Sequence, residues 1–527
     1  MKDNKFAAEH NCKKITDLMN ISNRFRTIIL AAICLVYILV RFWDLTTSCL
    51  WFDEIFSVHA AEQPWNSLFW FIAQDLIHPP FFYILLKAWM TIGVESISWL
   101  RFFPVLLSII ALVPFLLLCR ELKLKFFAIV SALSFFAVNG SLIKYAQEVR
   151  MYSLLLCLSL FSMWLFARFF FRGKNFWLLT IINILLVYTH YFGWLVVLSE
   201  VAAILIMQRI KIRHILLMFA VAFISFLPWI VAVIQAANIG ADVKQNIGWI
   251  ATPGISSILE LALDLVEPFY YQQSNANPTS IFIVAVPILL LILASKILFY
   301  VNWKNVEDKK PFYLLTLFSA VPIIAAFIAS WLLPVSVWGS RHLIIVFAPT
   351  IILSALFLTE IRSKKVKIVF VSILFTLFCA AFFIRLRIDH SQYIWCAWEN
   401  LAADIRVLES ETTEPVKIYV FEELVAYHFW FALRDSDKFQ VNVVKGIEGL
   451  TEDAAYFLPR GFETVKTTDE SNINGERFWI AFRAEKWELT SPPLSNLLTK
   501  GYKVGEPRVI EAGNLKAFIA EVSKPGH

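Results

Sequence analysis

The stretch SCLWFDEIFSVHAAEQPWNSLFWFIAQDLIHPP, residues 48–80, follows an apolar run that is long enough to cross a membrane. It contains the adjacent acidic pair Asp53 and Glu54, then Asp75 and His78, but neither Lys nor Arg. Ionisable groups at a membrane are costly and usually functional. An acidic pair also suits a helix N-terminus, where it satisfies free N–H groups. The stretch therefore indicates either a catalytic pair or a helix cap.

The composition places most of the chain in lipid. Of its 527 residues, 59% are hydrophobic and 17% are charged, with a mean hydropathy of +0.66. Soluble domains have about 25% charged residues. The formal net charge of +6 is modest and gives no indication of a nucleic-acid partner. The expected fold class is therefore a mainly α, polytopic membrane protein.

Eleven apolar runs predict membrane-spanning helices, since a span needs about 20 mostly apolar residues. These runs cover 27–44, 99–119, 126–143, 153–171, 176–189, 192–208, 215–235, 280–300, 312–332, 343–360 and 367–385. A further run, 79–95, begins with two prolines and carries Lys87 in its middle. Counting it as a span would place five basic loops outside, against the usual Lys/Arg bias toward the cytoplasm. We therefore expect 79–95 to be a helix in the outer membrane interface.

This count predicts the domain organisation and the orientation of the chain. Residues 1–26 form a basic cytoplasmic segment, and 27–386 form the membrane domain, in which 45–98 is a first outer loop with interfacial helices. Residues 387–527 change in composition and contain runs typical of strands (VKIYVF, FQVNVV, RFWIAFRA, KAFIAEV) and of helices (WCAWENLAADIRVLES, ELVAYHFWFALR). We expect a small α/β domain on the outer face.

The cysteines show neither a zinc pattern nor a disulfide framework. The seven are Cys12, Cys34, Cys49, Cys119, Cys157, Cys379 and Cys396. Cys49 and Cys396 are predicted on the same oxidising side, but the sequence does not show that they pair. The first apolar run has no signal-cleavage pattern, so we expect it to remain as the first span.

Polar residues that topology does not explain gather near the outer ends of the predicted spans. Besides the four in the first loop, they are Lys144, Gln147, Glu148, Arg150, Tyr152, His190, Tyr191, Asp264, Glu267, Arg341 and His342. A transporter places its site near the bilayer midplane. A rim of polar groups suits a catalyst that acts on a lipid head group, with carboxylates as bases and Arg or Lys binding phosphate.

Several of these residues also have a purely structural interpretation. Lys144 and Glu148 have the i, i+4 spacing of a helix-face ion pair. Arg341 at a helix end suits snorkelling to head groups, and Tyr191 suits the aromatic belt of a membrane interface. The spacing of Asp75 and His78 places them on one helical face, as two metal ligands would lie, but two ligands do not make a metal site.

Four segments together resemble one family. LWFDEIFSVHAAE, AQDLIHPPFFYILLKAW, LIKYAQEVRMYSLLLCL and GSRHLIIVFAP resemble the polytopic GT-C glycosyltransferases of the protein-mannosyltransferase and aminoarabinose-transferase type (family 39-like). The resemblance is strongest over about residues 30–200, weaker to about 390, and not usable in the tail. It implies an inverting sugar transfer from a polyprenyl-phosphate donor at the outer face of a bacterial inner membrane.

The resemblance also implies site roles. The catalytic acidic pair of the family corresponds to Asp53 and Glu54: one of the two, with Asp53 preferred, is the base for the acceptor hydroxyl, and Glu54 orients the acceptor or donor. Lys144, Arg150 and Arg341 are the candidates for binding the donor phosphate, and we expect contact between them and the acidic pair. The remaining positioning candidates are Asp75, His78, Gln147, Glu148, Tyr152, His190 and His342.

The implied partners are a polyprenyl-phosphate sugar, the lipid bilayer, and an acceptor that is lipid A, lipopolysaccharide, another envelope glycan or a protein. No metal ligand set is assigned, although a divalent metal stays open because metal use differs within the superfamily. A lipid-linked donor agrees with the absence of Walker and GxGxxG motifs from the sequence. Two alternatives remain, a lipid or polysaccharide transporter (or flippase) with a phosphate site at its outer rim, and a non-catalytic scaffold.

Overall fold

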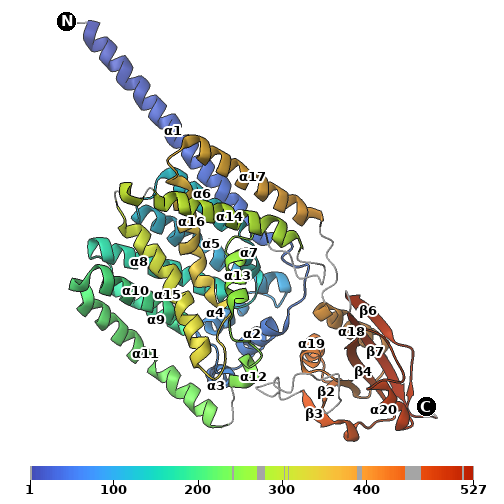
Figure 1. Ribbon diagram of the computed structural model, residues 1–527. Coiled ribbons are helices and arrows are strands. Elements are labelled where there is room, and N and C mark those ends of the chain that lie inside the picture. The colour runs from blue at the N-terminus through green and yellow to red at the C-terminus, as the bar shows by residue number, and fades with distance from the viewer. Residues whose placement is uncertain are drawn as a thin grey trace.

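The computed structural model describes the backbone of residues 3–239, 243–269, 279–301, 303–306, 308–387, 394–445, 465–512 and 515–525. A bundle of helices makes up most of the molecule, and a smaller domain built around a sheet lies at the end away from the N-terminus (Figure 1). The structure is thus mainly α with a small α/β domain, as the sequence predicts.

Eight helices in the described residues are long and apolar enough to cross a membrane. They are α1 (Asp3–Phe42, apolar from Asn23), α5 (Ile97–Glu121), α8 (Tyr152–Arg172), α11 (Ile212–Asn238), α14 (Thr279–Val301), α15 (Lys310–Leu332), η3 with α16 (His342–Val346 and Phe347–Thr359) and α17 (Lys364–Arg387). Four shorter apolar helices are α4 (Phe81–Met90), α6 (Phe126–Val138), α9 (Phe176–Thr189) and α10 (Gly193–Met207). Helices therefore cover all eleven predicted runs, and the chain is an integral membrane protein.

One predicted span is wrong in its extent. The run 126–143 is not a single helix, because α6 ends at Val138 and α7 (Gly140–Gln147) begins after Asn139. The Asn139 side chain accepts a 2.9 Å hydrogen bond from the Leu142 amide and so caps α7. The Gly140 amide donates instead to the backbone oxygen of Glu267, at 2.8 Å. This break turns α7 away from the α6 axis and into the site described below.

The first loop contains short helices, α2 (Phe52–Glu62), α3 (Trp65–Asp75) and α4 (Phe81–Met90). At 1.5 Å per residue, the ten residues of α4 span about 15 Å, half of a bilayer core. The helix that forms within the run 79–95 is therefore too short to cross the bilayer. Lys87 Nζ donates to the backbone oxygens of Ala61 and Gln63, at 3.0 and 2.8 Å. Its ammonium group therefore satisfies carbonyl groups at the C-terminal end of α2.

The remaining short helices connect the spans. They are η1 (Arg209–Lys211), α12 (Val243–Ile247), α13 (Ile255–Asp264) and η2 (Trp303–Asn305). Within the bundle α5 packs against α8, α1 and α16 against α6, α9 against α8 and α11, and α15 against α10 and α16. Helix α7 packs against α1, α5 and α8, and η3 packs against α8 and α15.

The α/β domain has a sheet in the order β3-β2-β1-β4-β7-β5, with β6 also paired to β7. Its elements are α18 (Ile394–Leu408), β1 (Val416–Val420), α19 (Glu423–Leu433), β2 (Phe439–Lys445), β3 (Lys466–Asp469), η4 (Glu470–Asn472), β4 (Arg477–Ala484), α20 (Leu494–Thr499), β5 (Lys503–Val504), β6 (Arg508–Ala512) and β7 (Leu515–Ser523). Strands β1 to β4 pair in parallel, and β7 runs antiparallel to β4. The four predicted strands and both predicted helices are confirmed.

Both faces of this sheet are buried. In β4, Phe478, Ile480 and Phe482 belong to one apolar cluster, while Trp479 and Ala481 belong to the other. The alternation follows from the period of two along a strand. Helices α18 and α19 pack on the sheet, and α19 also packs on α2, which fixes the domain against the first loop.

Candidate active site

Asp53 lies in the first turn of α2, and two arginines from distant segments reach it. Arg341 Nη1 lies 3.2 Å from Asp53 Oδ2, and Arg150 Nη2 lies 3.9 Å from the same oxygen. Arg150 Nη1 also donates to the backbone oxygen of Asp53, at 3.1 Å. The contact expected between the acidic pair and the cations is therefore present for Asp53. Only part of the Asp53 carboxylate is exposed, so these ion pairs lie in a poorly solvated place.

Arg150 extends this cluster to His78 and Asp75 at the other end of the first loop. Its Nη2 lies 3.1 Å from His78 Nε2, and His78 Nδ1 lies 2.6 Å from Asp75 Oδ2. Because a guanidinium only donates, His78 Nε2 accepts and Nδ1 carries the proton that is donated to Asp75. Burial, together with the charge of Arg150, lowers the pKa of His78. His78 is thus a neutral link that orients Arg150, and its contact with Asp75 is a hydrogen bond.

Glu54 lies next to Asp53 but has a different environment. Its buried carboxylate accepts from Arg101 Nε and Nη2, at 3.1 and 2.9 Å. It also accepts from the backbone amides of Trp51 and Val149, at 3.1 and 2.9 Å. The helix-cap interpretation therefore holds for Glu54, through the Trp51 amide, whereas Asp53 faces the arginines. Because both Glu54 oxygens are bonded within the protein, we assign it to holding segments together, not to orienting a substrate.

Two further predicted residues also form hydrogen bonds to backbone groups of other segments. Gln147 Nε2 donates to the backbone oxygens of Arg41 and Trp43, at 3.1 and 2.7 Å, and so joins α7 to the end of α1. Tyr191 Oη donates to the backbone oxygen of Leu76, at 3.2 Å. These contacts place α7 and the α9–α10 turn around the first loop.

A carboxyl-rich region surrounds Lys144 beside the arginine cluster. The spacing of Lys144 and Glu148 predicts a helix-face pair, but α7 ends at Gln147 and Glu148 has extended backbone, so that geometry is wrong. Burial raises the pKa of Glu148 to about 7, against the opposing charge of Lys144. Burial also raises the pKa of Glu267 to about 8, and that of Asp264. Glu148 and Glu267 therefore take up protons near neutral pH.

Three histidines gather behind Arg150. The ring centres of His78 and His190 are 5.8 Å apart, and those of His190 and His342 are 5.4 Å apart. His190 Nδ1 accepts from the Phe192 amide at 3.1 Å, so the proton of the neutral ring is on Nε2. Burial and His342 lower the pKa of His190, which keeps it neutral. Among the described residues, no group of three or more His, Cys, Asp or Glu side chains is placed to hold a metal ion.

Several buried polar atoms in this region have no hydrogen-bond partner among the described residues. They are Trp51 Nε1, Tyr83 Oη, Glu148 Oε2, Arg150 Nε, Tyr152 Oη and His190 Nε2. Tyr83 and Tyr152 lie within electrostatic range of Arg150 and Asp53. Buried polar groups are normally bonded. Apart from the carboxyl oxygen of Glu148, these atoms can donate hydrogen bonds, and unbonded donors beside two arginines suit the binding of an anion.

The sequence interpretation missed two residues of this site. Arg101 carries a detectable signal, since it is a charged residue in the first turns of a predicted span. Tyr83 on α4 carries none, because one tyrosine in an aromatic run is typical of a membrane interface.

Comparison with known proteins supports the fold. The sequence matches no protein-family model and no curated protein. The structure is similar to that of ArnT from Cupriavidus metallidurans bound to undecaprenyl phosphate, with a TM-score of 0.56 at 12% identity over 94% of this chain and 97% of ArnT. The apo structure of ArnT gives a TM-score of 0.55 at 11% identity over 95% of this chain and 98% of ArnT. This chain therefore shares its overall fold with ArnT.

Proposed function

We propose that this protein is a membrane glycosyltransferase that moves a sugar from a polyprenyl-phosphate donor to an acceptor of the cell envelope. The observation that carries the proposal is the position of Asp53, a carboxylate that contacts Arg341 and Arg150 beside unbonded buried donors. The likeness to ArnT, whose structure contains undecaprenyl phosphate, supports the same donor class.

The arginines bind the phosphate of the donor. Arg341 is the more accessible of the two, with 22% of its side chain exposed against 3% for Arg150. When a phosphate approaches, Arg341 exchanges part of its contact with Asp53 for the phosphate oxygens, which it binds in bidentate geometry. This exchange releases Asp53 Oδ2 to accept a proton, so donor binding prepares the base. Lys144 adds positive charge on the Glu148 side.

The transfer is a single displacement with inversion. The acceptor hydroxyl oxygen attacks the anomeric carbon of the sugar, and its proton moves to Asp53. The bond between the anomeric carbon and the phosphate oxygen breaks, and its electron pair stays on the polyprenyl phosphate. The guanidinium groups of Arg150 and Arg341 stabilise this developing negative charge. Because the leaving phosphate needs no proton, one base is enough.

The other candidate residues set the geometry of these groups. Asp75 and His78 orient Arg150 through their hydrogen-bonded chain. Tyr152 and His190 have unbonded buried atoms and lie within electrostatic range of both arginines. The predicted positioning residues that complete this set are Glu148 and His342.

We place the reaction on the extracytoplasmic side of a bacterial inner membrane, with a cytoplasmic N-terminus. Cys49 and Cys396 form a disulfide beside the site, and disulfides persist in oxidising compartments. Arg101, Arg150 and His190 lie at or just before the starts of α5, α8 and α10, whereas the basic connections follow the opposite ends of these helices, as expected for the cytoplasmic side. The acceptor in this arrangement is an envelope glycan, a glycolipid such as lipid A or lipopolysaccharide, or a protein.

The test uses purified protein, a radiolabelled polyprenyl-phosphate sugar and an extract of membrane lipids and glycans. We expect transfer by the wild type, and a loss of about 10²–10⁴-fold in Asp53→Asn with donor binding retained. Glu62→Gln is the matched control, since Glu62 lies on the same helix and also pairs with an arginine, Arg434, at 3.2 Å. Undiminished transfer by Asp53→Asn would exclude Asp53 as the base. Movement of labelled lipid across liposomes without sugar transfer would favour the transporter.

A further inference from the structure

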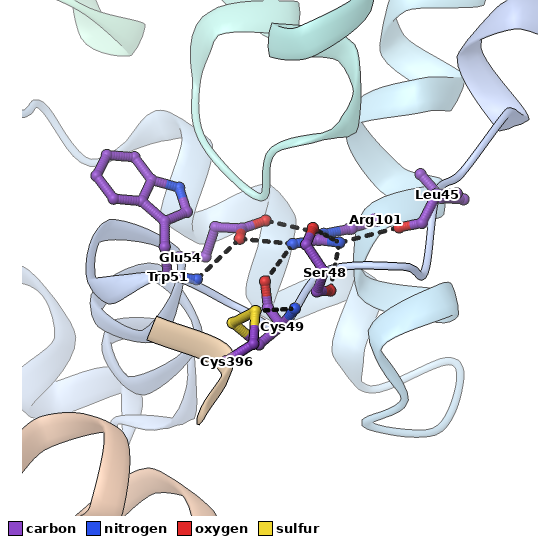
Figure 2. Close-up of a disulfide and its surroundings, with 7 residues drawn as sticks. All are labelled: Leu45, Ser48, Cys49, Trp51, Glu54, Arg101 and Cys396. Atoms are coloured by element: carbon purple, nitrogen blue, oxygen red, sulfur yellow. Dashed lines mark hydrogen bonds and ion pairs between the residues drawn. A yellow bond between two sulfur atoms is a disulfide. The ribbon is translucent and has the colours of Figure 1, made fainter. Parts of the chain in front are cut away.

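Arg101, in the first turns of α5, is the centre of a hydrogen-bond network beside the site (Figure 2). Its Nη1 donates to the backbone oxygens of Leu45 and Ser48 and to Ser48 Oγ, at 2.9, 2.8 and 3.0 Å. Its Nη2 donates to the backbone oxygen of Cys49 at 2.6 Å, and Nε and Nη2 bind the Glu54 carboxylate. One buried guanidinium thus joins the loop after α1 to the start of α2.

Glu54 transmits this position to both sides of the site. Its acceptance of the Trp51 amide fixes the first turn of α2, which also contains Asp53, the residue before Glu54. Its acceptance of the Val149 amide fixes the segment that continues into Arg150. Asp53 therefore adjoins Glu54 in the chain, and Arg150 adjoins Val149, whose amide binds the Glu54 carboxylate. The separation of 3.9 Å between their side chains depends on Glu54, and the place of Glu54 depends on Arg101.

The disulfide anchors the far side of the network. Cys49 and Cys396, 347 residues apart in sequence, have Cα atoms 5.2 Å apart and join the loop after α1 to α18 of the α/β domain. The Cys49 backbone oxygen is a direct acceptor of Arg101 (Figure 2). The disulfide therefore limits the movement of the loop after α1, which supplies four of the acceptors of Arg101.

We infer that Arg101, anchored by the Cys49–Cys396 disulfide, is a positioning residue that sets Asp53 against Arg150, so that catalysis depends on an intact link to the α/β domain. The inference rests on the proposed function for its activity readout. A lysine retains the charge at this position but has three donors on a flexible stem in place of the planar five-donor fork. A misplacement of about 1 Å at a reacting group lowers rates by about a hundredfold.

The activity test compares Arg101→Lys with Arg385→Lys, which changes another buried arginine, paired with Asp44 at 2.7 Å. We expect kcat to fall by about tenfold to a hundredfold in Arg101→Lys, with the donor KM changed less than threefold, and to stay near wild type in Arg385→Lys. An equal fall in both variants, or a rise in KM alone, would overturn the positioning role.

The disulfide is tested by the double variant Cys49→Ser/Cys396→Ser against Cys34→Ser/Cys379→Ser, which removes two free cysteines. We expect kcat to fall to the same degree in Cys49→Ser/Cys396→Ser and in wild type treated with a reductant. In Cys34→Ser/Cys379→Ser we expect kcat to stay at the wild-type value. The first double variant should be insensitive to the reductant. Full activity after reduction would overturn the inference.

A second readout does not depend on sugar transfer. Hydrogen exchange at the Val149 and Trp51 amides, which both donate to Glu54, reports the network directly. We expect faster exchange at both amides in Arg101→Lys and in Cys49→Ser/Cys396→Ser, with unchanged exchange in the controls. If the wild type transfers no sugar and both variants exchange faster than it does, the result contradicts the proposed function but supports the network. Unchanged exchange would contradict the network itself.

Discussion

Arg341 Nη1 and Asp53 Oδ2 lie 3.2 Å apart although 288 residues separate them in the sequence. The pair joins the loop before α16 to the first turn of α2, and Arg150 approaches the same carboxylate from the segment before α8. A carboxylate held by two cations is stable as an ion pair, and a phosphate that attracts the same cations competes with it. This competition explains how one site serves both donor binding and proton removal in the proposed reaction.

The first prediction concerns this exchangeable arginine. In Arg341→Ala we expect the Kd for polyprenyl phosphate to rise roughly 10- to 100-fold, because charge-assisted hydrogen bonds contribute about 1.5–3 kcal/mol. Equilibrium binding in detergent or nanodiscs measures the change. Arg434→Ala is the control, since Arg434 pairs with Glu62 at the same 3.2 Å and is similarly exposed. Equal weakening in both variants would argue against a phosphate role for Arg341.

The second prediction concerns the unbonded hydroxyl of Tyr83. Tyr83→Phe removes a buried hydroxyl that has no partner among the described residues, so we expect thermal stability to be unchanged or slightly higher. Donor binding should weaken, because the hydroxyl lies close to Arg150 and Asp53. Tyr37→Phe provides the contrast: its hydroxyl bonds to Ser108 at 2.8 Å, so this variant should lose about 1 kcal/mol of stability. A loss of stability without weaker binding in Tyr83→Phe would give this residue a structural role only.

The third prediction concerns pH. Burial raises the pKa of Glu148 from 4.5 to about 7 in the folded protein. The folded state therefore holds this proton more tightly than the unfolded chain, and the resulting stability is fully present below about pH 4.5 and is lost as the pH rises through about 7. We expect the melting temperature of the wild type to decline over this window, and Glu148→Gln to show a smaller decline. Parallel curves for the two proteins would refute the assignment.

The fourth prediction concerns orientation. A cysteine placed at Lys123, in the exposed turn after α5, should react with a membrane-impermeant thiol reagent only after the membrane is opened. A cysteine placed at Lys500, exposed at the end of α20, should react in intact cells from which the outer barrier has been removed. Labelling of both sites from the outside would show that the predicted span count is wrong.

The sequence by itself determined the membrane fold and pointed to most residues of the candidate site. Apolar runs of the right length specify spanning helices because lipid admits little else, and Lys87 with two prolines indicated that α4 does not cross. Asp53, Arg150 and Arg341 were identifiable because ionisable residues near a membrane are rare and costly. Each of these signals is local, and each can therefore be read from a short segment.

The tertiary structure decided what those residues do relative to one another. Asp53 and Glu54 are adjacent and chemically similar, yet one faces two arginines and the other is enclosed by Arg101 and backbone amides. Burial and partners set this difference, and both depend on segments far away in the chain. The break at Asn139 likewise depends on the loop after α13, which takes up the backbone groups that a continuous helix would have bonded itself. The sequence supplied the charged groups, and long-range packing selected which of them meet.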